Sequence, residues 1–456
     1  MKDSKVTRLR QGAKALLVHF SDPSDSFFAR VLSTEEVAAV VARHVKVFRR
    51  RIFSPVDTLR LFVGQMLSAD GACQDTVARH LSERVEQGQA QNTLNTASYC
   101  QARARLPVQI PKELCGTLGA RLEQAAPVWW RWCGRRVKLF DATVVSMPDT
   151  QSNQQAYPQN GREQPGLGFP KARIGALIGL ASGAVLGYGI AACKGKGTGE
   201  QGLLGGLLDL LDANDVVLAD ALLAGWWGIC DIHARGADVV MRQNGRRATD
   251  FRRGMRLGKN DHVVEWPRPP RPQAMSPEQY ESYPRTLVMR EVKVNGRVLV
   301  TTMLQPRQAP GGALDALYSA RWNIEVDFRT IKCTMQMDVL RCKTVEMIDK
   351  EIATGLLAYN LVRWAMVSAA SLCEVLPRAL SFKDAKRVLN AFADQLRHAV
   401  HATITVVLEK IATLKLPFRP DRIEPRAKKR RPKNLPMLTV PRQQARAALR
   451  LRRGLS

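Results

Sequence analysis

RRVKLFDATVV, residues 135–145, is the point at which the sequence changes from helical to strand character. Val137 and Leu139 alternate with Lys138, and apolar residues at every second position are typical of a β-strand with one buried face. We therefore predict a strand here, with Lys138 on the face opposite the two apolar side chains. Asp141 lies within the same apolar run, where an ionised carboxylate is costly unless it is paired or bound to a metal.

Strands and helices alternate downstream of this segment. The sequence predicts a polar loop at 148–165, a β-hairpin at 171–194, a helix at 203–211 opened by a capping box at 198–201, a strand at 215–220, a helix at 222–234 and a strand at 237–242. The order strand, strand, strand, helix, strand, helix, strand predicts a mixed α/β sheet. Asp220 ends one of these strands and is a second acidic residue expected at the sheet.

The longest uncharged run, residues 174–193, belongs to the predicted hairpin. Its length alone would allow a membrane span. Its five glycines, at 175, 179, 183, 187 and 189, would make a poor isolated helix and favour two short strands around a turn. We therefore expect no membrane segment here.

The charge balance indicates the kind of partner. Of 456 residues, 69 are Lys or Arg and 41 are Asp or Glu, which gives a net charge of +28. A field of this sign recruits phosphate backbones, so nucleic acid is the first candidate partner and an anionic membrane surface the second. Nine cysteines without a CxxC pair, and a start without a secretory signal, indicate reduced thiols in the cytoplasm.

Composition also divides the chain into regions. We expect a helical N-terminal domain, an α/β core, a basic β-rich insertion within that core, a helical C-terminal region and a basic tail, at 1–130, 131–345, 242–308, 346–415 and 416–456. The helical pattern at 55–67 and 77–85 supports the first of these. The insertion ends in a predicted hairpin around Asn295-Gly296 and begins with a cluster of arginines at 242, 246 and 247.

The segment LDALYSARWNIEVDFRTIK, residues 314–332, predicts a single helix with a polar face. Tyr318, Arg321, Glu325 and Lys332 fall within an arc of about 60° at 100° per residue. An apolar stripe beside them would pack on the sheet, whereas Asp327 falls on the far side. Glu325, and not Asp327, is thus expected at the edge of the core. Taken alone, the helix is equally an ordinary amphipathic helix with an Arg321–Glu325 pair.

The spacing Tyr318-x2-Arg321-x3-Glu325-x6-Lys332 resembles the motif of the bacterial DDE transposases of the insertion sequence 4 family. The segments KLFDAT at 138–143 and LADA at 218–221 resemble that family's two aspartate-bearing strands, and Tyr359-Asn360 lies in a downstream helical segment. The likeness extends over roughly residues 50 to 440. The chain departs from the family after Asp220, where Ala-Leu stands in place of the frequent Arg-Gly.

The resemblance implies a ribonuclease H-like fold interrupted by the β-rich insertion, and an enzyme that binds terminal inverted repeats. Asp141, Asp220 and Glu325 would be its catalytic carboxylates and would hold two Mg²⁺ ions, or Mn²⁺ in their place, with Asp141 bridging both. In similar enzymes the freed 3′ hydroxyl attacks the opposite strand to form a hairpin, which is reopened before the DNA joins its target. Pairing of two DNA ends implies at least a homodimer on double-stranded DNA.

The resemblance also suggests which residues contact DNA. Tyr318, Arg321 and Lys332 would grip the phosphates of the DNA end. The basic insertion would follow the DNA with Arg242, Arg246 and Arg247, and Trp266 is either a packing residue or a platform for an extruded base. Two other functions stay open from the residues alone: a DNA-binding regulator without catalysis, and a ribonuclease H-like nuclease that cuts without joining.

Overall fold

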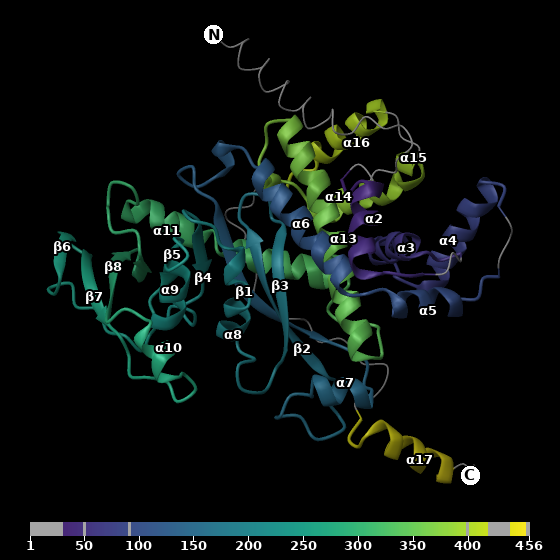
Figure 1. The fold of residues 1–456 in the computed structure, drawn as a ribbon, viewed down its shortest axis with the longest axis horizontal. Coiled ribbons are helices and arrows are strands. Elements are labelled where there is room, and N and C mark those ends of the chain that lie inside the picture. The colour runs from purple at the N-terminus through teal and green to yellow at the C-terminus, as the bar shows by residue number, and fades with distance from the viewer. Residues whose placement is uncertain (1–30, 49–51, 90–92, 398–400, 418–437, 453–456) are drawn as a thin grey trace.

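A computed structural model describes residues 31–48, 52–89, 93–397, 401–417 and 438–452. In this part of the chain one nine-stranded sheet runs through the centre, with the order β3-β2-β1-β4-β5-β9-β8-β7-β6 (Figure 1). Its first five strands in the chain are β1 (Val137–Ser146), β2 (Lys171–Gly179), β3 (Val185–Ala192), β4 (Val216–Ala219) and β5 (Asp238–Arg242). The pairs β1–β4 and β4–β5 are parallel, whereas β1–β2 and β2–β3 are antiparallel. The predicted mixed α/β sheet is confirmed.

The central strand β1 is buried on both of its faces. One face joins a core cluster built with the helices α6 (Gln109–Ala125) and α13 (Val345–Leu372), and the other packs against α8 (Glu200–Gly205) and α9 (Trp226–His233). Lys138 is only 3% exposed, and its Nζ lies 2.6 Å from Asp215 Oδ2. The predicted alternation is confirmed, since Val137 and Leu139 face one core cluster and Phe140 faces the other. The expectation of only one buried face is wrong, because helices cover both sides of the sheet at this strand.

The segments on either side of the β2–β3 hairpin differ from prediction. The hairpin itself is confirmed, but the expected loop at 148–165 contains a short helix, α7 (Gln151–Ala156), whose N-cap Thr150 accepts a hydrogen bond from Asn153 N. The predicted capping box at 198–201 does not form. The N-cap of α8 is Gly199, and the Thr198 hydroxyl donates instead to the carbonyl oxygen of Gly195 at 2.8 Å.

The insertion extends the same sheet instead of forming a separate one. Its strands are β6 (Met255–Gly258), β7 (Asp261–Pro267), β8 (Thr286–Val294) and β9 (Arg297–Thr301), with a short helix α10 (Pro277–Glu281). β9 pairs antiparallel with β5, so the insertion continues the core sheet to the left of Figure 1. The β8–β9 turn is the predicted one, because Asn295 and Gly296 both have positive φ, 49° and 76°.

Helices from both ends of the chain surround α13. The N-terminal helices are α2 (Thr34–His44), α3 (Pro55–Leu67), α4 (Cys73–Glu86), α5 (Ala97–Arg105) and α6, and the later ones include α14 (Phe382–Ala391), α15 (Ala393–Arg397) and α16 (His401–Thr413). Most of them gather on the right of Figure 1, whereas α6 lies beside β3 and packs against both that strand and α13. The helices predicted at 55–67 and 77–85 correspond to α3 and α4. Residues 418–437 and 453–456 of the basic tail lie outside the described residues, and α17 (Arg442–Arg452) projects from the body.

The segment predicted as one helix at 314–332 is broken. It forms α11 (Gly311–Ser319), α12 (Trp322–Arg329) and a π-helical turn, η3 (Thr330–Thr334). At the break, the N–H of Asn323 bonds to the carbonyl of Ala320, three residues back instead of four. The prediction that one continuous helical face runs through residues 314–332 is therefore wrong outside α12.

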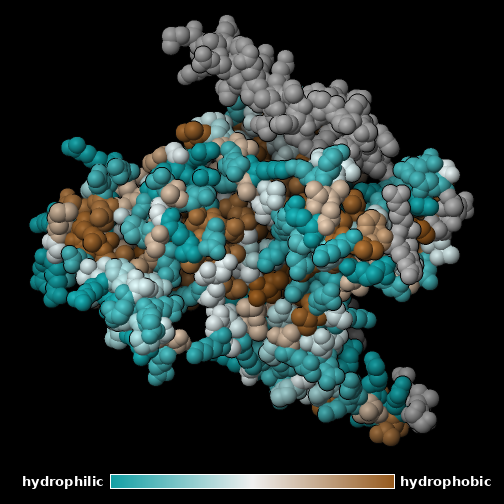
Figure 2. Space-filling model, viewed as in Figure 1, coloured by the Kyte–Doolittle hydropathy of each residue, from teal (hydrophilic) through white to brown (hydrophobic). Residues whose placement is uncertain are grey.

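The surface in Figure 2 is mostly hydrophilic, with isolated hydrophobic areas. One of them lies at the end of the sheet that carries β6–β8, where Met255 and Val288 are exposed. Among the described residues, no helix is both long and apolar enough to cross a membrane.

Candidate active site

Two of the predicted carboxylates lie side by side because β1 and β4 are parallel. Their register pairs Val137 with Val216 and Leu139 with Leu218. Continued by two residues, the same offset sets Asp141 on β1 beside Asp220, which directly follows β4. Strands in a sheet are spaced about 4.8 Å apart, so the two side chains start from neighbouring positions.

The third carboxylate reaches the same place from a helix. α12 packs on β1 and carries Glu325 toward Asp141. Arg321 lies between them: its Nη2 is 2.7 Å from Glu325 Oε1, and its Nη1 is 3.6 Å from Asp141 Oδ2. The polar side chains that we placed on one helical face, Arg321 and Glu325, therefore do face the sheet together.

The neighbouring carboxylates affect the pKa of Asp141. Burial raises the pKa of Asp141, and the negative charges of Asp220 and Glu325 raise it further, whereas the Ala142 N–H and the Arg321 guanidinium oppose the shift. The positive charge of Arg321 therefore does not offset the cost of ionising Asp141. A divalent cation would supply further positive charge.

A fourth carboxylate, which the sequence did not reveal, belongs to the same group. Burial raises the pKa of Glu200, and the charges of Asp141 and Asp220 add to the effect. Glu200 is the first residue of α8, which packs against β1, β2 and β3. We had interpreted it as part of a capping box. The available signal was its position between the two aspartate-bearing strands.

A cavity of about 400 Å³ opens beside Asp141 and Glu325. Its wall includes Lys332 and Arg329. The Lys332 ammonium lies 2.9 Å from Asp338 Oδ1, and that carboxylate is largely exposed. The cavity is therefore lined by both carboxylates and cations, which suits a phosphate approaching a metal ion.

The remaining predicted site residues differ in their exposure and in their partners. Asp220 uses one oxygen to accept the N–H of Leu222 at 2.8 Å, which leaves its second oxygen for a ligand. Tyr318 lies on α11, is only 9% exposed and joins the core. On the insertion, Arg242 and Arg246 are exposed.

The remaining arginine of the insertion covers a tryptophan. The Arg247 guanidinium lies 3.9 Å from the centroid of the Trp266 ring. Trp266 is 2% exposed, and its indole N–H donates to Glu291 Oε1 at 2.9 Å. Trp266 is thus a packing residue in this structure, and its face is not open to an extruded base.

Asp327 also differs from its predicted position. It is not on a solvent side of the helix but is 0% exposed, where it pairs with Arg363 and Arg378. The predicted position of Glu325 at the edge of the core is confirmed, because Arg321 links this carboxylate of α12 to Asp141.

The donor set fits a hard divalent cation in its chemistry. Mg²⁺ and Mn²⁺ prefer oxygen ligands, and the site offers carboxylate oxygens. A bound cation would also offset the repulsion that Asp141 experiences from the neighbouring carboxylates. Within the described residues, no group of three Asp, Glu, His or Cys side chains is already arranged to hold a metal ion. The Arg321 guanidinium occupies the space between Asp141 and Glu325, so cation binding requires it to move.

A family model and a sequence relative indicate the same family. A family model described as "Transposase DDE domain" matches residues 132–361, about half of the chain. The transposase InsG for insertion sequence element IS4 of Escherichia coli strain K12 is 29% identical over 360 residues, which cover 75% of this chain and 78% of that protein. A cryo-EM structure of the piggyBac transposase synaptic complex with hairpin DNA aligns with 90% of this chain and 87% of its own, at a TM-score of 0.42 and 8% identity.

Proposed function

Because the chain belongs to the DDE transposases of the insertion sequence 4 type, we propose that it cuts DNA at the inverted repeats of an insertion sequence and joins the freed ends to target DNA. The observation that carries the proposal is the meeting of Asp141 and Glu325 at one guanidinium, beside a cavity lined with cations. Double-stranded DNA is the partner, in keeping with the net charge of +28.

Asp141, Asp220 and Glu325 are the proposed catalytic residues and metal ligands. Two Mg²⁺ ions, or Mn²⁺ in their place, would activate the attacking oxygen and stabilise the leaving 3′ oxygen when bound. Asp141 is central to the set, since it is the carboxylate whose pKa responds to both of the others. Asp220 is held for this task by the Leu222 N–H, which fixes one of its carboxylate oxygens.

Arg321 has two successive partners in this proposal. Without DNA, its guanidinium neutralises Asp141 and Glu325 and keeps both carboxylates in place. A DNA phosphate is likewise a bidentate partner for a guanidinium, and the arrival of the DNA end together with Mg²⁺ would draw Arg321 away from the acids. Lys332 would turn from the exposed Asp338 to a neighbouring phosphate.

The proposal also covers the fold of the core, the DNA-binding regions and the assembly. We assign the core a ribonuclease H-like fold, which the strand order β3-β2-β1-β4-β5 supports. The helices before residue 130 would bind the transposon end, and the exposed Arg242 and Arg246 of the insertion would follow the DNA. A hairpin intermediate, a homodimer on paired ends and action on DNA in the bacterial cytoplasm complete the proposal.

The decisive experiment for this function separates joining from cutting. Purified protein, a labelled fragment carrying the end of its own element, Mg²⁺ and a supercoiled target plasmid are incubated together. A transposase gives a product in which the labelled 3′ end is covalently joined to the plasmid. Cleavage without any joined product would indicate a nuclease, and binding without cleavage would indicate a DNA-binding regulator.

A further inference from the structure

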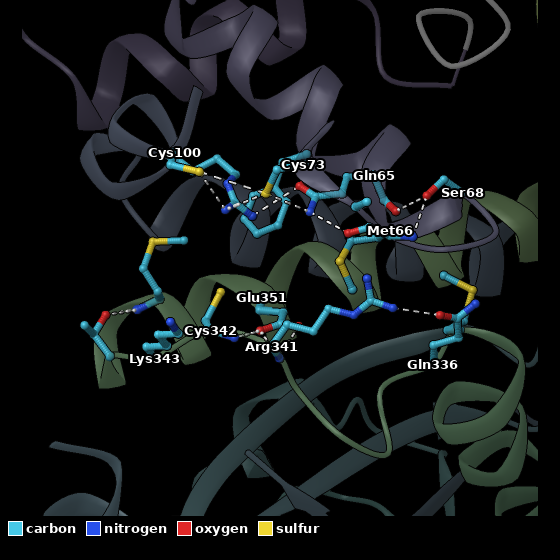
Figure 3. Close-up of a pocket in the computed structure, with 17 residues that line it drawn as sticks. Gln65, Met66, Ser68, Cys73, Cys100, Gln336, Arg341, Cys342, Lys343 and Glu351 are labelled. Atoms are coloured by element: carbon cyan, nitrogen blue, oxygen red, sulfur yellow. Dashed lines mark hydrogen bonds between the residues drawn. The ribbon is translucent and has the colours of Figure 1, made fainter. Parts of the chain in front are cut away.

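Three cysteines that are far apart in the sequence meet at one cavity. Cys73 is the first residue of α4, Cys100 lies on α5, and Cys342 lies in the segment that precedes α13. All three line a cavity of about 490 Å³ between the N-terminal helices and that segment. Figure 3 shows Cys73 and Cys100 side by side, with Cys342 on the opposite wall. The sulfur atoms of Cys73 and Cys100 are 4.0 Å apart.

A buried arginine has these sulfurs as partners. Arg103 is 8% exposed, and its Nη2 lies 3.3 Å from Cys73 Sγ and 3.7 Å from Cys100 Sγ. Its Nη1 donates to Gln65 Oε1 at 3.1 Å, and the faces of two aromatic rings cover the guanidinium. Among the described residues, no carboxylate pairs with Arg103, although a buried charge is costly without a counter-charge. A thiolate at Cys73 or Cys100 would provide one.

The surroundings of Cys73 favour it as the first thiol to react. It stands at the N-terminus of a 14-residue helix, and Gln65 Nε2 lies 3.5 Å from its sulfur in addition to Arg103. Helix N-termini and neighbouring arginines stabilise a thiolate. Burial raises the pKa of Cys73 and Arg103 opposes that rise, so the resting form is the thiol with a guanidinium ready to accept the charge.

The cavity also gives an oxidant access. Cys73 and Cys100 are half-buried, and the cavity between them and Arg341 has room for a small molecule such as a peroxide. The loop that precedes Cys73 is tied to the opposite wall, because Arg341 donates to the carbonyl of Asp70 and Gln336 donates to that of Ala69. A change at Cys73 therefore occurs at the junction between the N-terminal helices and the core.

We propose that Cys73 and Cys100 are a redox-active pair that forms a reversible disulfide on reaction with a hydroperoxide. The Cys73 thiolate attacks one peroxide oxygen, the O–O bond breaks, and Cys73 becomes a sulfenic acid while the other oxygen leaves and is protonated to water or an alcohol. The Cys100 thiolate then attacks the Cys73 sulfur and releases the second oxygen as water. The two thiols lose two electrons and two protons in total, and the peroxide is reduced.

The geometry allows this bond with a small movement. A disulfide holds its sulfurs at about 2.05 Å, so rotation of two side chains has to bring them closer by about 2 Å. The short α5 and the first turn of α4 carry the two residues, and both side chains border the cavity. Cys342 is the remaining thiol of the group, and its position on the opposite wall makes it the weaker partner.

The test uses the full chain in which the three exposed cysteines, Cys133, Cys333 and Cys373, are replaced by serine, which leaves six thiols. Oxidation with hydrogen peroxide, alkylation and peptide mapping should give a Cys73–Cys100 crosslink, the loss of two titratable thiols and their full return after reduction. Replacement of Cys100 by serine should leave a sulfenic acid at Cys73 that a dimedone probe labels. Replacement of Cys73 should abolish both products.

The unmodified chain provides a check that depends on no variant. Its oxidised peptides should contain the same Cys73–Cys100 crosslink, since the exposed cysteines do not border the cavity. The proposal would be overturned if all six thiols of the serine variant survived peroxide unchanged. A crosslink of Cys73 to Cys342 in either protein would also overturn it. Because every readout is chemical, the outcome is independent of whether the protein cuts DNA.

Discussion

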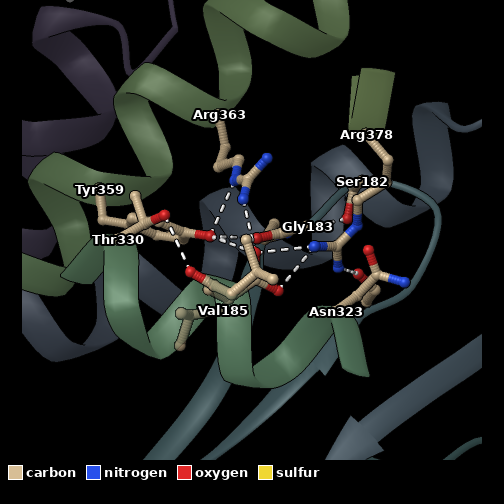
Figure 4. A network of polar contacts seen from close by, with 12 residues as sticks. Ser182, Gly183, Val185, Asn323, Thr330, Tyr359, Arg363 and Arg378 are labelled. Atoms are coloured by element: carbon tan, nitrogen blue, oxygen red, sulfur yellow. Dashed lines mark hydrogen bonds and ion pairs between the residues drawn. The ribbon is translucent and has the colours of Figure 1, made fainter. Parts of the chain in front are cut away.

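Asp327→Asn is the substitution that most sharply probes how α12 is held. Asp327 is fully buried two residues after Glu325, and its Oδ1 accepts hydrogen bonds from Arg363 Nη2 at 2.6 Å and Arg378 Nη1 at 2.7 Å. Figure 4 shows Arg363 and Arg378 approaching the same place from two sides, with Tyr359 nearby, and both arginines form ion pairs with Asp327. Asparagine keeps the size of the side chain, but it removes the negative charge and points an amide at the guanidinium groups.

The expected loss of stability is large because two cations stay behind. The Arg363 side chain is 5% exposed and that of Arg378 is 17% exposed, so neither regains full hydration when its partner is lost. Breaking a buried ion pair by removal of one partner costs about 3–5 kcal/mol. Arg378 also donates to the carbonyls of Gly179 and Leu180, which limits how far it can move away. We therefore expect a value toward the upper part of that range.

Urea unfolding followed by tryptophan fluorescence measures the effect. The matched control is Asp209→Asn, which removes a carboxylate from a pair with Arg235 in which Asp209 is 95% exposed, and no change in the midpoint is expected there. The same preparation of Asp327→Asn should bind Mn²⁺ more weakly, because α12 positions Glu325. A loss of less than about 1 kcal/mol would refute the view that this buried cluster anchors the helix.

Four further outcomes follow from the site. Asp141→Asn should raise the thermal unfolding midpoint in EDTA at neutral pH, because the raised pKa of Asp141 means that its ionised form is disfavoured in the folded state; a fall would contradict this. Lowering the pH toward that raised pKa should stabilise the wild type and leave Asp141→Asn unchanged. Arg321→Gln should bind Mn²⁺ about tenfold more tightly by calorimetry without DNA, and weaker binding would refute the competing guanidinium. Glu200→Gln should slow DNA nicking at limiting Mg²⁺ while end binding by gel shift stays the same.

The strands and their acids were predictable because they rest on local pattern. Apolar runs bounded by turn residues gave β1, β4 and β5 within a residue or two, and the Asn295-Gly296 turn has a backbone geometry that few other pairs adopt. Asp141 and Asp220 stood out as carboxylates in such runs. Their proximity follows from one further step, the parallel pairing of β1 with β4.

The rest depended on contacts that a single sequence does not show. Lys138 looks like a solvent-facing residue until Asp215, far along the chain, is placed beside it. Asp327 was assigned to the outer side of an isolated helix, whereas Arg363 and Arg378 come from later segments to cover it. The break before α12 and the approach of Glu200 to the aspartates are likewise products of packing, which overrides the local pattern.

Metal-dependent cleavage tests the central claim most directly. The purified protein is incubated with the DNA that flanks its own gene, with Mg²⁺ or with EDTA, beside Glu325→Gln and the exposed control Asp209→Asn. We predict nicks at the inverted repeats with Mg²⁺ in the wild type and the control, none in EDTA, and none with Glu325→Gln although it still binds the ends. Cleavage by Glu325→Gln at the wild-type rate would contradict the assignment of Asp141, Asp220 and Glu325 as one catalytic site.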